Sequence, residues 1–137
     1  MIDKERVTVL LATLEDYLKE LRQKTGLSLE KYKKDQDRQR ITERMLQLIS
    51  ETELDVAEEL YKGLGLKLSE SERSMISSLE EPLGKETIAG LLRRRSLRNQ
   101  LVHTYRSYNQ DEVFEQADKT KDVEAFINTV KKVLKQR

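Results

Sequence analysis

The spacing of apolar residues constrains the fold of this chain more than any other feature. Near the start, six apolar residues recur at three- and four-residue spacing: Val7, Leu10, Leu11, Leu14, Leu18 and Leu21. This spacing predicts a helix that begins after Asp3, buries one face and ends near Gly26. The same period returns in later segments, and only one proline and five glycines interrupt the 137 residues. We therefore expect an all-α fold with no sheet.

A second helix is predicted from Ser28, which can cap it, to Gly63 and Gly65. One face of this helix carries Ile41, Met45, Leu48, Ile49, Thr52, Val56 and Leu60. Its early part, from Glu30 to Arg40, is almost entirely charged. Such a segment either projects into solvent or contacts a partner, and projection is the commoner case.

A short third helix is expected next. Ser69 and Glu72 resemble a capping box, in which a serine and a glutamate three residues later satisfy the first backbone N–H groups of a helix. Pro82 and Gly84 should then stop this helix, because proline cannot continue it. The residues between them include only a few apolar positions: Met75, Ile76 and Leu79.

A fourth helix begins near Ile88, and the arginine run Arg93–Arg95 interrupts its apolar stripe before Leu97 and Leu101 resume it. After an acidic stretch, a last helix carries Val123, Phe126, Ile127, Val130 and Leu134 at helical spacing. The connections are short, which makes successive helices antiparallel neighbours. We predict a single domain over residues 1–137, an up-and-down bundle of four to five main helices.

Composition excludes several classes of site. The chain has 26 basic and 25 acidic residues, so its overall charge of +1 does not indicate a polyanionic partner. It has no cysteine and one histidine, which excludes disulfides and thiolate chemistry and disfavours a zinc site. We expect neither a metal nor a cofactor. The longest apolar run near the start, Val9–Ala12, is too short for a membrane span or a signal peptide, so we expect a cytoplasmic protein.

The residues that can carry chemistry lie in Leu97–Tyr105, late on the fourth helix. His103 is the only histidine, and imidazole takes up and releases protons near neutral pH. RNA cleavage without a metal needs such a group, together with donors that stabilise charge on the phosphorus. His103 fits the acid or base, Arg98 fits a bidentate phosphate clamp, and Asn99 fits a group that orients the imidazole or the phosphate.

Charge supports this interpretation, whereas the geometry of a single helix does not. Between Lys85 and Arg106 the net charge is +5, which would attract phosphate, and Arg94, Arg95 and Arg106 are candidate RNA-binding residues. Arg98 and His103, however, differ by about 140° around an ideal helix. Either the helix changes course near His103 or a second chain contributes, and we favour a homodimer. Taken alone, a single histidine and an arginine run are more often surface or packing residues.

Arg98, His103 and Tyr105 resemble the Arg-x4-His-x-Tyr signature of the HEPN superfamily, specifically the HepT-like toxins. The order of the helices, including the segment Ile41–Met45 in the second, resembles that family over nearly the whole chain. The resemblance implies an all-helical bundle that dimerises, with a metal-independent endoribonuclease site where two copies of the motif meet. Arg98 and His103 would be the catalytic pair, and Asn99 would support them.

The resemblance also implies a partner, a nucleotidyltransferase antitoxin of the MNT type that neutralises the toxin and modifies Tyr105 with AMP.

Two segments depart from the family pattern. Arg93–Ser96 replaces a more apolar, glycine-containing approach to the motif. The polar segment Ser69–Glu81 is expected to alter the third helix and the partner surface without touching the catalytic residues.

Two alternatives stay open. One is a non-catalytic helical module that binds a nucleotidyltransferase and uses the basic face only to recognise phosphate. The other is a purely structural helical protein. The position of the two His103 side chains in a dimer distinguishes the nuclease from these alternatives, because only a nuclease requires both side chains to face an open basic groove.

Overall fold

The computed structural model describes residues 1–67, 69–103 and 109–137. Over these ranges the chain forms eight helices and no strand, which confirms the all-α prediction. The four long helices are α1 (Lys4–Lys24), α3 (Gln36–Gly63), α6 (Lys85–His103) and α8 (Thr120–Gln136). The four shorter ones are α2 (Leu29–Lys33), α4 (Glu72–Ser77), α5 (Glu80–Leu83) and α7 (Gln110–Asp118).

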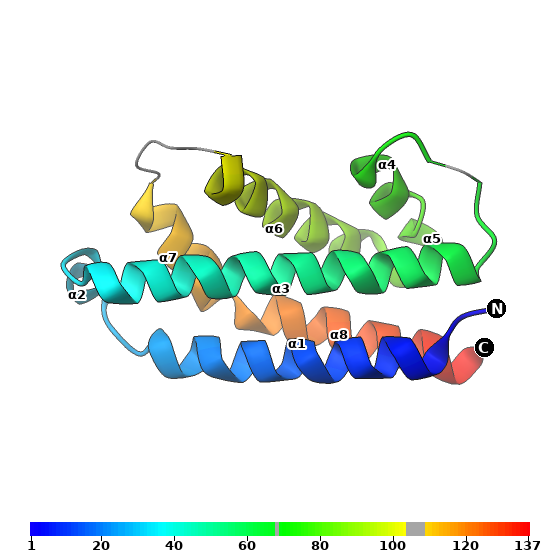
Figure 1. The fold of residues 1–137 in the computed structure, drawn as a ribbon, viewed down its shortest axis with the longest axis horizontal. Coiled ribbons are helices and arrows are strands. Elements are labelled where there is room, and N and C mark those ends of the chain that lie inside the picture. Colours follow the sequence, from blue (N-terminus) through cyan, green and yellow to red (C-terminus); the bar gives the residue numbers. More distant parts are fainter. Residues whose placement is uncertain (68, 104–108) are drawn as a thin grey trace.

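Successive long helices run in opposite directions, as the up-and-down prediction requires (Figure 1). Helix α3 packs against both α1 and α6, and α8 closes the bundle by packing against α1 and α6. Helices α4 and α5 lie at the end of the bundle where both termini lie, whereas α2 and α7 lie at the opposite end (Figure 1). Helix α6 runs from the first of these ends toward the second, so its last turn points toward the end of the bundle that holds α2 and α7 (Figure 1).

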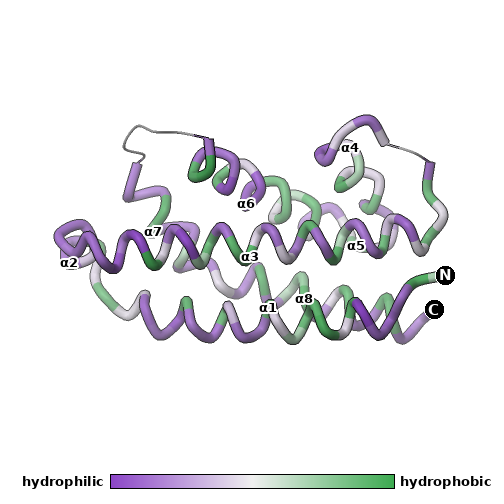
Figure 2. The backbone as a smooth tube through the Cα atoms, in the orientation of Figure 1, coloured by the Kyte–Doolittle hydropathy of each residue, from purple (hydrophilic) through white to green (hydrophobic). Residues whose placement is uncertain are grey.

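The core lies between the four long helices, and Figure 2 shows the apolar stretches of α1, α3 and α8 alternating with polar ones. The predicted stripe of α1 is confirmed, since five of its six residues are at most 3% exposed: Val7, Leu11, Leu14, Leu18 and Leu21. The stripe of α8 is confirmed by Val123, Phe126, Ile127 and Val130, each at most 4% exposed. Ile41 departs from the pattern because it is 39% exposed near the start of α3.

The predicted second helix is wrong in one respect, because the structure divides it in two. Ser28 caps α2 as expected, but that helix ends at Lys33, and Asp35 caps a new helix by accepting the backbone N–H of Arg38 at 3.0 Å. The break lets Tyr32 turn inward, where it is 1% exposed and its ring lies 5.2 Å from that of Phe114. The charged segment therefore folds back against α7 instead of projecting from the bundle.

The polar stretch after α3 also begins its helix elsewhere than predicted. Ser71, not Ser69, is the cap: its Oγ accepts the backbone N–H of Ser74 at 3.0 Å, while the Ser69 hydroxyl donates to the Ser71 carbonyl. Pro82 lies within α5, and Gly84 ends that helix with a φ of +90°, a conformation that favours glycine.

Helix α7 is absent from the sequence-based prediction, which treated this stretch as an acidic turn. Asn109 caps it by accepting the backbone N–H of Asp111 at 2.9 Å, and its buried residues are Val113 and Ala117. Two buried positions in nine residues are too few to produce a periodic signal. No described helix is both long enough and apolar enough to cross a membrane.

The assignment of the cap predicts different effects for the two serines. Ser71→Ala should lower the free energy of unfolding by about 1 kcal/mol, because a backbone N–H at the start of α4 loses its acceptor. Ser69→Ala should change it by less than about 0.5 kcal/mol, because the hydroxyl donates to an exposed carbonyl. Urea denaturation of both variants measures the difference. Equal losses would contradict the assignment of Ser71 as the cap.

Candidate active site

Arg98, Asn99 and His103 of the motif lie in the last turns of α6, late on the helix as the sequence predicts. Leu97 is 3% exposed and fixes this part of the helix against the core. Its neighbours Arg98 and Asn99 are half-buried, and His103, the last residue of the helix, is exposed. The motif therefore combines a buried anchor, a partly shielded guanidinium and an imidazole that solvent reaches.

One chain does not bring the guanidinium and the imidazole together. Helix α6 continues through His103, so the angle of about 140° between Arg98 and His103 applies to the folded chain. Arg98 lies at the edge of the buried face, with 18% of its side chain exposed, whereas His103 lies on the side that faces solvent. The two groups of one chain therefore do not point at a common position.

Arg98 is held by a carboxylate that the sequence does not identify as a site residue. Its Nη2 donates to Oε1 of Glu72 at 2.7 Å, and Nε of Arg95 donates to the same oxygen at 2.7 Å. Glu72 is the first residue of α4, in the polar segment expected not to touch the catalytic residues. That expectation is wrong, because α4 packs against α6 and brings the carboxylate to the motif. The available sequence signal was a pair of arginines three residues apart, which share a helix face.

Arg94 lies in the core, where it forms an ion pair, and not on the predicted phosphate-binding surface. Its Nε and Nη2 donate to the two carboxylate oxygens of Glu53 at 2.7 and 2.6 Å, and the two side chains are 7% and 1% exposed. Burial raises the pKa of the Glu53 carboxyl, while the adjacent Arg94 opposes that shift by favouring the anion. A guanidinium enclosed in this way does not reach an external phosphate, so we leave Arg94 out of the proposed RNA surface.

The positive charge that the sequence concentrates on α6 is offset by acids from other helices. Arg93 forms an ion pair with Asp122 of α8 at 3.3 Å, Arg94 pairs with Glu53 of α3, and Arg95 and Arg98 share Glu72 of α4. The net charge of +5 between positions 85 and 106 therefore overstates the basic character of this face.

Two of the predicted site residues, Tyr105 and Arg106, lie outside the described residues.

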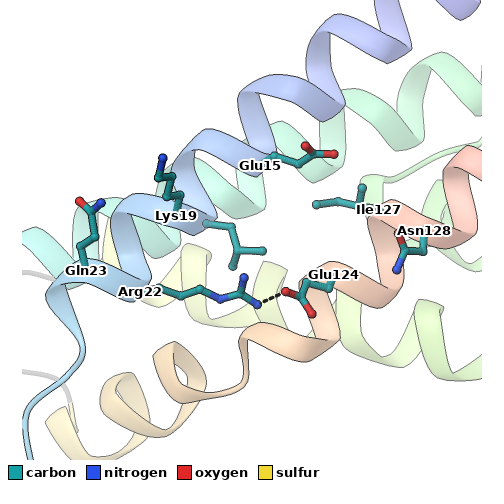
Figure 3. Close-up of a pocket in the computed structure, with 8 residues that line it drawn as sticks. Glu15, Lys19, Arg22, Gln23, Glu124, Ile127 and Asn128 are labelled. Carbon is teal, nitrogen blue, oxygen red and sulfur yellow. Dashed lines mark hydrogen bonds and ion pairs between the residues drawn. The ribbon is translucent and has the colours of Figure 1, made fainter.

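The described part of the chain has a separate groove between α1 and α8 (Figure 3). It has a volume of about 590 Å³ and is lined by Glu15, Leu18, Lys19, Arg22, Gln23, Glu124, Ile127 and Asn128. An ion pair between Arg22 and Glu124 crosses it, and Lys131 pairs with Glu15 at 2.8 Å nearby. No predicted site residue lines this groove, and no described group of histidine, cysteine or acidic residues is placed to hold a metal ion.

The family model described as HepT-like, "Ribonuclease HepT-like", matches residues 14–133. The chain belongs to the HepT-like ribonuclease family. This confirms the resemblance drawn from Arg98, His103 and the order of the helices. A comparison with curated proteins found no match.

Solved structures agree with the family assignment. A tri-AMPylated HEPN toxin from Shewanella oneidensis, in complex with an MNT antitoxin, is 26% identical to this HepT-like chain, with a TM-score of 0.84 over 96% of this chain and 98% of that one. A toxin–antitoxin structure with AMP-PNP is 25% identical, with a TM-score of 0.83 over 91% and 96%. The cytosolic protein YutE from Bacillus subtilis, at 15% identity, shares the fold with a TM-score of 0.83 over 98% and 92%.

The burial of Arg94 predicts a large effect on stability. Arg94→Met should lower the free energy of unfolding by about 3–5 kcal/mol, because it leaves the Glu53 carboxylate buried without a partner. The double variant Glu53→Leu/Arg94→Met should recover much of that loss, since no charge remains buried. Arg93→Met is the matched control: its pair with Asp122 is exposed, so the change should stay within about 1 kcal/mol. Urea denaturation that gave equal losses for both arginines would contradict this assignment.

Proposed function

We propose that this HepT-like chain is a toxin that acts as a metal-independent endoribonuclease, with an active site formed where two copies of the motif meet. The observation that carries the proposal is the position of the motif in a member of this ribonuclease family. His103 is exposed at the end of α6, and Arg98 lies five residues earlier with 18% of its side chain exposed. Both groups are thus placed where an RNA phosphate and a second protomer can approach them.

The proposed reaction uses the 2′-hydroxyl of the RNA as the nucleophile. The 2′-oxygen attacks the adjacent phosphorus and the bond from phosphorus to the 5′-oxygen breaks. The upstream fragment then ends in a 2′,3′-cyclic phosphate, and the downstream fragment begins with a 5′-hydroxyl. His103 takes the proton from the 2′-hydroxyl or gives one to the leaving oxygen, and Arg98 stabilises the charge that develops on the phosphoryl oxygens. Asn99 orients the imidazole or the phosphate, and Arg95 and Arg106 contribute to RNA binding.

A twofold axis beside the end of α6 would remove the geometric obstacle. It would bring both copies of Arg98 and His103 to one groove, so that the guanidinium of one protomer lies near the imidazole of the other. Val102, the residue before His103, is 42% exposed and supplies apolar area for such a contact. The homodimer is therefore part of the proposed mechanism.

We also propose that a nucleotidyltransferase antitoxin of the MNT type is the partner of this chain. The Shewanella oneidensis relative is a tri-AMPylated toxin in complex with an MNT antitoxin, at 26% identity over most of both chains. In this chain the proposed acceptor is Tyr105, two residues after His103. Transfer of AMP to its hydroxyl would add negative charge beside the groove and disfavour RNA binding.

The nuclease proposal predicts that RNA cleavage depends on two residues. The purified protein should cut RNA in the presence of a chelator, and His103→Ala and Arg98→Ala should each lower the rate by about 100-fold or more. Cleavage of a labelled RNA on a denaturing gel measures the rates. His103→Ala should leave the melting temperature unchanged, because the side chain is exposed.

Two controls complete this experiment. Sedimentation should give a dimer for the wild type and for both variants, since neither substitution removes core packing. Mixed dimers of Arg98→Ala and His103→Ala should regain part of the activity if one intact arginine and one intact histidine meet in the groove. Equal RNA decay with all proteins would instead support the non-catalytic binding module.

The proposed modification has its own test. Incubation with an MNT-type nucleotidyltransferase and ATP should add AMP to the wild-type chain and abolish its RNA cleavage, whereas Tyr105→Phe should stay unmodified and active. Mass spectrometry of the intact protein and of its peptides locates the adduct. Tyr108→Phe is the matched control, because it removes a neighbouring tyrosine. An adduct on any residue other than Tyr105 would contradict the proposal.

A further inference from the structure

We infer that Glu72 is a positioning residue, whose carboxylate holds the guanidinium of Arg98 in the orientation used for cleavage. This inference rests on the proposed nuclease function. It assigns a role to a residue of α4, outside the motif and 26 positions before Arg98 in the sequence. Three observations support it: the shared contact, the anchoring of Glu72 itself, and the donors that Arg98 keeps.

The shared contact joins two helices at one oxygen atom. Oε1 of Glu72 accepts from Nη2 of Arg98 and from Nε of Arg95, each at 2.7 Å. Hydrogen bonds of this length between ionised groups are roughly twice as strong as neutral ones. Arg95 and Arg98 are three residues apart, so they share a face of α6, and one carboxylate can bridge both. The two arginines and Glu72 together keep a net positive charge that attracts phosphate.

Glu72 is itself well anchored. It is the first residue of α4, and the Ser71 cap closes the turn in which it lies. Ile76, four residues later, is fully buried, as is Leu79 just after the helix. Helix α4 packs against both α3 and α6. The carboxylate therefore extends from a fixed backbone and can hold a longer, more flexible side chain in place.

The ion pair with Glu72 restrains Arg98 but does not use all of its N–H donors. A guanidinium has five N–H groups, and this ion pair uses Nη2. The side chain of Arg98 is 18% exposed, and its Nε is buried with no hydrogen-bond partner among the described residues, so the ion pair leaves donors of the guanidinium unused. Without a partner, an arginine side chain samples many rotamers, with an entropy of about 2 kcal/mol. A displacement of about 1 Å in a catalytic group can lower the rate of the chemical step by about 100-fold.

The test is Glu72→Gln in the full-length dimer, which removes the charge and keeps the shape of the side chain. With an RNA oligonucleotide, kcat should fall by about tenfold while KM changes by less than about twofold, because positioning acts mainly in the transition state. The matched control is Glu80→Gln: Glu80 also lies in the first turn of a short helix beside α6, and it forms no ion pair with a described residue. It should cleave at the wild-type rate.

A second readout separates positioning from a loss of folding. The ¹⁵N relaxation of the Arg98 Nε–Hε group should indicate a rigid side chain in the wild type, with an order parameter of about 0.85, and a flexible one in Glu72→Gln, below about 0.6. Melting temperatures of the two variants should agree within a few degrees. Glu72→Asp, which keeps the charge on a shorter side chain, should restore part of both the rate and the order of Arg98.

The outcomes distinguish the inference from the proposed function. A wild-type protein that does not cut RNA overturns the proposed nuclease, and this inference with it. Wild-type cleavage together with an unchanged kcat in Glu72→Gln overturns only the inference. A higher rate in Glu72→Gln also overturns it, because the carboxylate would then be competing with the RNA phosphate for Arg98. A lower kcat with an unchanged order parameter for Arg98 assigns Glu72 a role other than positioning.

Discussion

The buried ion pair between Glu53 and Arg94 fixes how α6 faces the rest of the molecule. Its two hydrogen bonds of 2.6 and 2.7 Å tie the middle of α6 to the middle of α3, and both side chains are almost fully enclosed. Gly90, one turn earlier, leaves space for the guanidinium, since a Cβ there would lie 3.0 Å from Nη1 of Arg94. A rotation of α6 about its own axis would pull Arg94 away from Glu53 and leave a buried charge without a partner. Because this is strongly destabilising, α6 has little freedom to rotate.

The directions in which Arg98 and His103 point follow from that rotation. His103 is nine residues after Arg94, about 180° around an ideal helix, so an inward Arg94 makes an outward His103. Arg98 is four residues after Arg94, about 40° away, which places it at the edge of the buried face, where Glu72 of α4 can reach it. The five-residue spacing separates Arg98 from His103 around the helix, and the ion pair in the core decides which of the two lies near the buried face. That separation is the physical reason why the proposed function includes a site formed by two protomers.

Acidic residues from neighbouring helices pair with the arginine run of α6, so the run is not a free basic patch. Counted along the sequence, the run resembles a basic patch for a polyanion, but each of its arginines has a carboxylate partner from another helix. Arg94 serves stability, Arg93 contacts α8, and only Arg95 and Arg98 remain partly available to a phosphate. The proposed RNA surface is therefore smaller and more specific than the local charge suggests. The affinity of this proposed surface for phosphate depends on how far the negative charge of Glu72 offsets the positive charges of Arg95 and Arg98.

The sequence by itself determined the features that depend on neighbours along the chain. The stripes of α1 and α8, the start of α1 after Asp3, the cap at Ser28 and the placement of Arg98 and His103 late on α6 could all be predicted, because helical period and capping act within a few residues. Only the tertiary structure decided the break at Asp35, where Tyr32 packs against Phe114, and the carboxylate partners of the arginines. Those contacts join residues 23 to 82 positions apart, and no local pattern encodes such pairings, because they depend on how whole helices pack.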